Sequence, residues 1–228
     1  MNKLKIYKLL RTLLLQDPNI KEEIKLKTNK YGNVGTDWTV ATNGLSAKTK
    51  VYTFGIGNDL SFEEEIVKKF GVKVYAFDPT PRSVEWTKKR KFPPNIKIYY
   101  FGISDKDGFA YFEAPQKDNY VSFRISDKKK NLLKLPVYRL GTILKMLKQK
   151  RIDILKLDVE GTEYRIIPEI LKSKLEIKQI LVEFHHRFSG FTKKDTEKSV
   201  SNLRRFGFKL YFVSDSGTEY SFINSKYL

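Results

Sequence analysis

Residues 51–61, Val-Tyr-Thr-Phe-Gly-Ile-Gly-Asn-Asp-Leu-Ser, decide the fold of this chain of 228 residues. The β-branched and aromatic residues at the start are typical of a buried strand, and the glycines that follow indicate a tight turn. We expect a helix to begin at Ser61, with a capping box formed by Ser61 and Glu64, and to end at Gly71. Strand, glycine turn and helix together form the first half of a parallel βα unit.

The alternation of strands and helices continues after this unit. The strand expected at 152–157 is almost wholly apolar, as a central parallel strand should be. A helical stretch follows this strand, and Pro168 within it is expected to break it into two pieces. The pattern predicts an open, mostly parallel α/β sheet with a C-terminal antiparallel hairpin. Strands are expected at 51–54, 72–77, 96–101, 152–157, 177–184, 208–213 and 220–223, helices at 82–91, 140–149 and 192–206, and an inserted hairpin at 109–114 and 120–125.

Length and composition indicate one globular domain. Hydrophobic residues make up 40% of the chain, which excludes disorder for most of its length. No apolar run approaches the roughly 20 residues that a membrane-spanning helix needs. The chain has no cysteine, which excludes disulfides and thiolate metal sites and makes a cytoplasmic location the default expectation. We divide the chain into an N-terminal helix and loop that cover the site, residues 1–50, and a main domain, residues 51–228.

The N-terminal part contains two distinct patterns. Residues 3–15 have the spacing of a basic amphipathic helix, which suits peripheral contact with a membrane surface, packing on the domain, or a lead-in from a longer polypeptide. Residues 27–50 are rich in Gly, Thr and Asn without a period, and we predict a loop in which Tyr31 and Trp38 fold over a ligand.

The net charge of +18 suggests a nucleic acid or another anionic partner. Only ten of the 44 basic residues are arginine, the side chain best suited to phosphates and base edges. The lysine clusters are scattered and fall mostly at the ends or outer faces of predicted helices. Nucleic-acid binding is therefore an alternative and not the leading interpretation.

The turns after the strands point to a cofactor, because ligands of open α/β sheets bind at the carboxyl ends of the strands. Gly55 and Gly57 follow the first strand, and Asp78 ends the second, 21 residues beyond Gly57, where an acid can bind a ribose diol. A dinucleotide fingerprint needs a third glycine where this chain has Leu60, and Asp59 would repel a pyrophosphate. No Gly-Lys-Ser/Thr sequence follows either. These residues favour a cofactor with ribose and adenine but no phosphate, and S-adenosylmethionine is the common one.

Residues 51–206 resemble the FkbM-type class I methyltransferases through VYTFGIGNDLSFE (51–63), YAFDPT (75–80), LKLDVEGTE (155–163) and LVEFH (181–185). The resemblance implies a Rossmann-like sheet of seven strands with helices on both faces, S-adenosylmethionine as methyl donor, and O-methylation, often of a sugar hydroxyl. The chain departs from many members at Thr53, where they have an acid, and at Asp59 or Leu60, where they have glycine.

The resemblance also implies positions around the donor. Gly55 and Gly57 would lie under its methionine part and Asp78 would bind its ribose. Ile103 and Ser104 would border the adenine, while Asp158 would face the methyl group. The complete set of expected cofactor-binding residues is Phe54, Gly55, Gly57, Asp59, Asp78, Pro79, Gly102, Ile103, Ser104 and Asp158.

Asp158, Glu183 and His185 are the candidate catalytic residues, at the ends of two central strands. His185 is the expected general base, because the ordinary histidine pKa of about 6.5 leaves a neutral fraction at pH 7. Glu183 would orient its ring, and Asp158 would lie near the sulfonium as an electrostatic partner. The alternative is that these three residues hold a divalent metal that acidifies the acceptor hydroxyl. His186 is expected to face away from His185, since neighbouring strand residues point to opposite sides.

The leading hypothesis is an S-adenosylmethionine-dependent O-methyltransferase whose carbohydrate acceptor is a deoxyhexose of a glycan or glycosylated product. Trp38, Tyr120 and Phe123 are expected in loops, where aromatic rings suit stacking on a sugar face. The alternatives are an RNA methyltransferase that uses the basic surface and a non-catalytic module of the same fold. Enzymes that methylate base amines usually carry Asn/Asp-Pro-Pro-Tyr/Phe where this chain has Asp158-Val159-Glu160-Gly161. Acceptor specificity is expected in residues 105–135 and 187–195.

Overall fold

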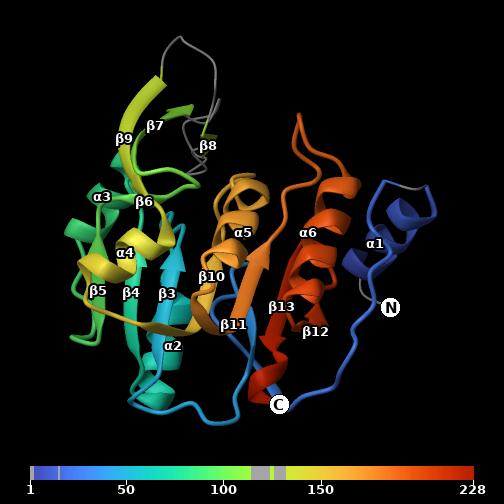
Figure 1. Ribbon diagram of the computed structural model, residues 1–228, viewed down its shortest axis with the longest axis horizontal. Helices are drawn as coiled ribbons and strands as arrows, with labels where there is room; N and C mark the ends of the chain where they lie inside the picture. Colours follow the sequence, from blue (N-terminus) through green and yellow to red (C-terminus); the bar gives the residue numbers. More distant parts are fainter. Residues whose placement is uncertain (1–2, 15, 114–123, 126–131) are drawn as a thin grey trace.

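The computed structural model describes residues 3–14, 16–113, 124–125 and 132–228, and its centre is a seven-stranded sheet in the order β12-β13-β11-β10-β3-β4-β5 (Figure 1). Neighbouring strands from β11 to β5 pair in parallel, whereas β13 pairs antiparallel with β11 and β12. The predicted mostly parallel sheet with a C-terminal hairpin is confirmed. Its strands are β3 (Lys50–Phe54), β4 (Lys73–Phe77), β5 (Ile96–Tyr99), β10 (Arg151–Leu157), β11 (Glu176–Glu183), β12 (Phe208–Val213) and β13 (Glu219–Asn224), and a short 3-10 turn (Ser225–Tyr227) follows.

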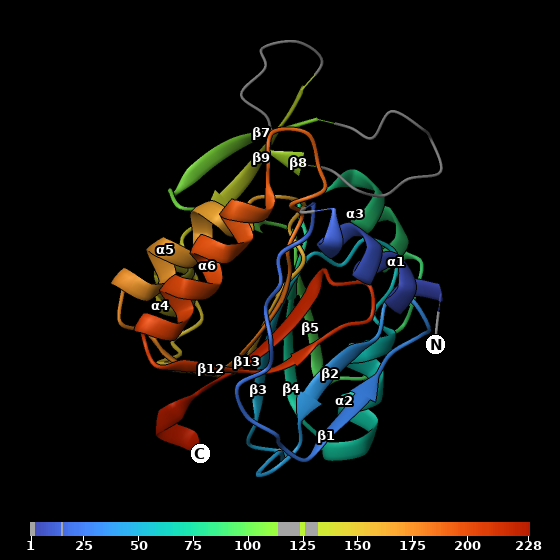
Figure 2. The same cartoon turned by 90° about the vertical axis from the view of Figure 1, so that its right-hand side faces the viewer.

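Helices cover both faces of this sheet, as predicted (Figure 2). Alternate residues of β3 show how: Tyr52 and Phe54 are buried in one core with Ile166 and Ile167, while Val51 is buried in a second core with Ile66. One face carries α4 (Leu140–Met146), α5 (Glu163–Lys172) and α6 (Lys193–Arg205), and the other carries α2 (Ser61–Phe70) and α3 (Pro81–Lys88).

Helix α2 begins at Ser61 and ends at Gly71 as predicted, but the capping box is wrong. No side chain caps the first turn at its N-cap position. The backbone N–H of Ser61 donates to Asp59, and its hydroxyl accepts a hydrogen bond from the N–H of Asn33. A contact with a distant loop has therefore replaced the local one, which sequence spacing cannot anticipate.

The expected loop at 27–50 contains an antiparallel hairpin, β1 (Thr28–Tyr31) and β2 (Trp38–Ala41). All of β2 is buried, because the hairpin packs on the sheet beside α2. The side-chain amide of Gln179 bonds both the N–H and the carbonyl of Ala41, and Ser221 donates to the carbonyl of Thr39. The backbone of this short strand thus bonds side chains far away in the chain, which the local sequence cannot reveal.

Pro168 lies inside α5, so the expected break is wrong. A proline within a helix costs about 3 kcal/mol, because it removes one hydrogen bond and crowds the preceding turn. Burial of one large aliphatic side chain contributes roughly 1.5–3 kcal/mol, so several of them offset this cost. The buried side chains of α5 include Ile166, Ile167, Ile170 and Leu171.

A four-stranded sheet, in the order β6-β9-β7-β8, stands over the carboxyl ends of the central strands (Figure 1). Its strands are β6 (Gly102–Ile103), β7 (Gly108–Glu113), β8 (Arg124–Ile125) and β9 (Leu132–Tyr138). The predicted strand at 109–114 is confirmed over its described residues, and that at 120–125 is described only at 124–125. The strand expected at 96–101 ends at Tyr99 because the chain then crosses to this second sheet.

Helix α1 (Lys3–Leu13) touches the rest of the chain through its polar side. Lys8 donates to the carbonyl of Ser214, and Lys5 pairs with Asp215. None of its described residues is buried, and its exposed apolar side chains include Leu4, Leu9, Leu10 and Leu13. No helix in the described part of the chain is long and apolar enough to cross a membrane.

Candidate functional site

A cavity of about 390 Å³ lies at the carboxyl ends of β3, β4, β10 and β11. Its volume is within the range of roughly 300–1,000 Å³ that small-molecule sites occupy. Nine of the ten residues predicted to bind the cofactor line it, together with all three candidate catalytic residues. Ser104 lies outside the lining and bonds Asp105 and Tyr138 instead.

The lining is acidic although the chain as a whole is strongly basic. Among the residues that the structure describes, the cationic or potentially cationic side chains of the lining are Lys156 and His185. The carboxylates are Asp37, Asp59, Glu63, Asp78, Asp158, Glu160, Glu183 and Glu219. The electrostatic character of the cavity therefore favours a cationic or neutral ligand over a polyanion.

The glycine turn after β3 lies against the turn after β10. Gly55 has a φ of +89°, and a Cβ built there would lie 1.8 Å from the carbonyl oxygen of Asp158. The N–H of Gly55 donates to Phe77 and that of Asp158 donates to Phe54. Only glycine allows this approach, which places Asp158 at the edge of the cavity.

Asp78 is buried at the end of β4 and holds the glycine turn from the other side. One carboxylate oxygen accepts hydrogen bonds from the N–H groups of Ile56 and Gly57, both 3.0 Å long. The other accepts from the N–H and hydroxyl of Thr80. An ionised carboxylate has about four acceptor sites, so a ribose would share or replace some of these bonds.

Asp59 connects the glycine turn to the turn between β1 and β2. Its carboxylate accepts hydrogen bonds from Asn33, Thr36 and the N–H of Ser61. Burial opposes ionisation of this carboxyl, but these hydrogen bonds lower its pKa below the ordinary value. Asp59 thus holds the hairpin turn over the cavity.

Lys156 is a buried lining residue that the sequence analysis missed. Its Nζ lies 3.5 Å from Glu63 and 5.2 Å from the centre of the Trp38 ring. The hydroxyl of Thr53 donates to the same Glu63 oxygen. The signal that could have revealed this group is a lysine in an otherwise apolar central strand. Trp38 itself is in strand β2 and not in a loop, which corrects that prediction, and Tyr120 and Phe123 lie outside the described residues.

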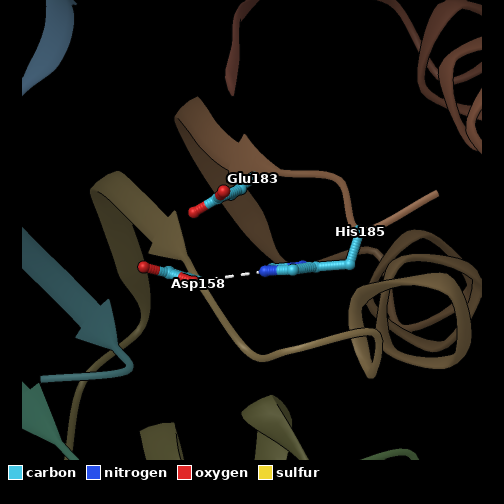
Figure 3. Close-up of side chains that lie close together, drawn as sticks. All are labelled: Asp158, Glu183 and His185. Atoms are coloured by element: carbon cyan, nitrogen blue, oxygen red, sulfur yellow. Dashed lines mark ion pairs between the residues drawn. The ribbon is translucent and has the colours of Figure 1, made fainter. Parts of the chain in front are cut away.

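Asp158, Glu183 and His185 converge at one end of the cavity (Figure 3). One potential ligand atom from each lies within 4.8 Å of the others. His185 Nε2 is 3.7 Å from Asp158 and 3.5 Å from Glu160. Its Nδ1 lies 3.2 Å from Glu163, a fully buried residue that also accepts the backbone N–H of His185. Glu163 was not among the predicted site residues, because its role depends on where the turn before α5 meets the end of β11.

The pKa of His185 contradicts its assignment as a general base with an ordinary pKa. Burial alone would lower it, but the hydrogen bond and charge of Glu163, together with Glu183 and Asp158, raise the pKa to about 10. The imidazole is therefore protonated at pH 7 and cannot accept a proton there. Burial raises the pKa of Glu183 well above the usual glutamate value, and the charge of Asp158 adds to that shift.

His186 points away from this cluster as expected, although both histidines follow the last residue of β11, so strand alternation is not the cause. Its Nε2 contacts buried Asp17 at 3.1 Å, and its Nδ1 lies 3.3 Å from Thr196. Asp17 also accepts hydrogen bonds from Arg11 and Arg187. Burial opposes its ionisation, but the two arginines lower the pKa of Asp17 to about 2. This group joins the segment after α1 to the end of β11 and serves the structure.

Comparison with solved structures shows the same fold in an archaeal protein. The fibrillarin pre-rRNA processing protein of Methanococcus jannaschii matches with a TM-score of 0.50 and 13% identity, over 92% of this chain and 87% of that chain. At this identity the likeness concerns the fold alone.

Two curated relatives are similar in sequence. The probable methyltransferase-like protein 24 of Rattus norvegicus is 26% identical over 172 residues, and that of Homo sapiens is 26% identical over 153 residues. These matches cover 71% and 66% of this chain but 42% and 36% of the relatives, so the chain spans less than half of their length. The model of the methyltransferase FkbM domain matches residues 45–210, and the chain belongs to this methyltransferase family.

Proposed function

We propose that this chain is an S-adenosylmethionine-dependent O-methyltransferase whose acceptor is a sugar hydroxyl, in particular that of a deoxyhexose in a glycan or glycosylated product. Membership of the FkbM methyltransferase family supports the donor and the reaction class. The observation that carries the proposal is the cluster of Asp158, Glu183 and His185 in the same cavity as the glycine turn. The residues proposed to bind the donor and those proposed to accept the proton thus line the same cavity.

The residues present fit the donor. Gly55 and Gly57 line the cavity without side chains, and the close contact of Gly55 with Asp158 keeps that acid at the cavity beside the space proposed for the methionine part. Asp78 is the candidate ribose ligand, while Pro79, Gly102 and Ile103 offer apolar surface to the adenine. When bound, S-adenosylmethionine supplies an electrophilic methyl carbon on a cationic sulfur, and the acidic lining suits that charge.

The acceptor end of the cavity suits a neutral hydroxyl. In the proposed reaction the hydroxyl oxygen forms a bond to the methyl carbon while the carbon–sulfur bond breaks and its electron pair remains on sulfur. The hydroxyl proton passes to a carboxylate oxygen of Glu183 or Asp158, both of which line the cavity. Proton transfer of this kind typically contributes about 10²–10⁴ in rate. Protonated His185 lies beside both carboxylates and would hold them in place.

The acidic lining argues against RNA as the acceptor, because the RNA phosphates would lie close to the carboxylates of the cavity. In the described part of the chain, most of the lysines and arginines lie away from the cavity. Lys156 lines the cavity, but it is paired with Glu63. RNA methylation and a non-catalytic role are the two alternatives, and an activity measurement distinguishes both from sugar methylation.

A methyl-transfer assay tests the proposal. The chain is incubated with donor carrying a labelled methyl group and with deoxyhexose glycosides, RNA and small phenols in parallel. We expect label in a sugar and none in RNA. Label in RNA alone would replace the acceptor class, and S-adenosylhomocysteine binding without any transfer across the panel would favour the non-catalytic module.

We also propose a cytoplasmic location, which rests on the lack of cysteine. A further part of the proposal is a peripheral membrane contact through α1. Helix α1 exposes Leu9 and Leu13 beside basic residues, a pattern that suits an anionic lipid surface. Replacing both leucines with glutamate is expected to lower partition onto phosphatidylserine vesicles about tenfold or more, measured by sedimentation. The control is Met146→Glu, an equally apolar exposed site elsewhere. Equal partition of both variants and wild type would contradict this contact.

A further inference from the structure

The acceptor end of the cavity brings four carboxyl groups around one imidazole. In the described part of the chain, the ring of His185 lies near Asp158 and Glu160 on one side and Glu163 on the other, and Glu183 adds its charge to the same cluster. Glu163 and His185 are buried, while Asp158, Glu160 and Glu183 are half-buried at the cavity. Like charges at such distances are unfavourable, and either a proton or a bound cation can compensate them.

The arrangement of His185 is that of a metal ligand. Its Nδ1 is held by a hydrogen bond to Glu163, which is fully buried and also accepts the N–H groups of Gly161 and His185. A metal-bound histidine almost always has its second ring nitrogen held by such a group. The ring itself is buried, and Nε2 points toward Asp158 and Glu160, beyond ordinary hydrogen-bond distances.

The spacing of the ligand atoms suits a divalent ion. Atoms of Asp158, Glu183 and His185 all lie within 4.8 Å of one another, and Nε2 is 3.7 Å from Asp158. Metal–ligand distances of about 2.0–2.2 Å place neighbouring ligands about 3 Å apart and opposite ones about 4 Å apart. Small side-chain rotations therefore close the set around one ion, which would replace the proton on Nε2.

We propose that Asp158, Glu183 and His185 bind one divalent cation, with Glu163 holding His185 in place, and that the remaining positions of the ion bind the acceptor hydroxyl. One imidazole with two carboxylates suits Mn²⁺, because carboxylates favour Mg²⁺ and Mn²⁺ while imidazole favours later transition metals. The ion would make the hydroxyl more acidic and bring its oxygen to the donor end of the cavity. This inference rests on the proposed function for its acceptor, but not for the ion itself.

Binding of Mn²⁺ tests the site without any assay of activity. The full chain is freed of metal with a chelator, dialysed and titrated with Mn²⁺ while the electron paramagnetic resonance signal of free Mn²⁺ is recorded. We expect about one ion per chain and, in pulsed spectra, coupling to an imidazole nitrogen. Glu183→Gln and His185→Ala are expected to weaken binding at least a hundredfold, and Glu163→Gln 10–100-fold. Glu85→Gln removes the same charge at an exposed site and should change nothing.

Several results would overturn the proposal. The proposal fails if the wild type does not bind Mn²⁺ or if the bound ion shows no nitrogen coupling. It also fails if the Glu183→Gln and Glu85→Gln variants bind Mn²⁺ equally well. Thermal melting identifies any variant that fails to fold, and the nitrogen coupling is measured on the wild type and needs no variant. Methyl transfer that proceeds unchanged in chelator would remove the ion and leave the proposed function intact. If the chain binds Mn²⁺ but not S-adenosylhomocysteine, the metal site stands and the proposed function fails.

Discussion

Replacement of Gly55 with alanine is expected to weaken S-adenosylhomocysteine binding at least a hundredfold. The new Cβ would lie 1.8 Å from the carbonyl oxygen of Asp158 and 2.9 Å from its carbonyl carbon, both backbone atoms that cannot rotate away. The alanine would also have to adopt a φ of +89°, which costs about 1–3 kcal/mol. The turns after β3 and β10 must separate, and both line the cavity. Calorimetric titration measures the affinity, and thermal melting measures the accompanying loss of stability.

The matched control is Gly190→Ala. Gly190 has a φ of +94°, nearly that of Gly55, but no atom lies within 4 Å of a Cβ built there. The control therefore carries the backbone strain without the collision. If the Gly55 variant bound S-adenosylhomocysteine as well as the Gly190 variant, the close approach of the two turns would not be needed for the donor site.

Replacement of Asp78 with alanine is expected to weaken S-adenosylhomocysteine binding at least tenfold. The proposed ribose bonds are hydrogen bonds to a charged group, each worth about 1.5–3 kcal/mol, and about 1.4 kcal/mol corresponds to a factor of ten. The structure adds a second cause, because the N–H groups of Ile56 and Gly57 lose their acceptor. Calorimetry on the folded variant gives the affinity.

A deoxyribose analogue of S-adenosylhomocysteine separates these two causes. If Asp78 binds the ribose, removal of the hydroxyls should weaken binding to wild type but have little further effect in Asp78→Ala, as in a double-mutant cycle. Asp107→Ala, which removes a carboxylate in a surface pair with Arg139, should leave binding unchanged. An equal penalty for the analogue in wild type and the Asp78 variant would show that Asp78 only holds the glycine turn.

The seven strands of the central sheet, their order along the chain and the edge of the sheet where the cavity lies could be predicted from the sequence alone. Alternation of apolar residues and the glycines at 55, 57 and 71 are local signals, since strand pleating, tight turns and helix ends depend on neighbouring residues. Parallel strands then bring the residues at their carboxyl ends to one edge of the sheet. Asp78, Asp158 and Glu183 could therefore be predicted to lie close together from the sequence alone.

Tertiary structure decided whatever depended on contacts between segments far apart in the chain. The hairpin at 28–41 was missed because its strands are short and its second strand is held by backbone bonds to the distant side chains of Gln179 and Ser221. Pro168 stays in a helix because the helix is packed on the sheet over buried side chains. Local propensity is a weak determinant where burial contributes several kilocalories per mole.

The chemistry of His185 is the clearest case of such dependence. From sequence its pKa is the ordinary one, whereas Glu163, 22 residues away in the chain, together with Glu183 and Asp158 raises it to about 10 against the effect of burial. A pKa depends on the charges and solvent within a few ångströms, and these are set only when β10, β11 and α5 come together. Residue types therefore sufficed to select the cluster, while only its packing showed that His185 is held by a buried carboxylate and directed at two others.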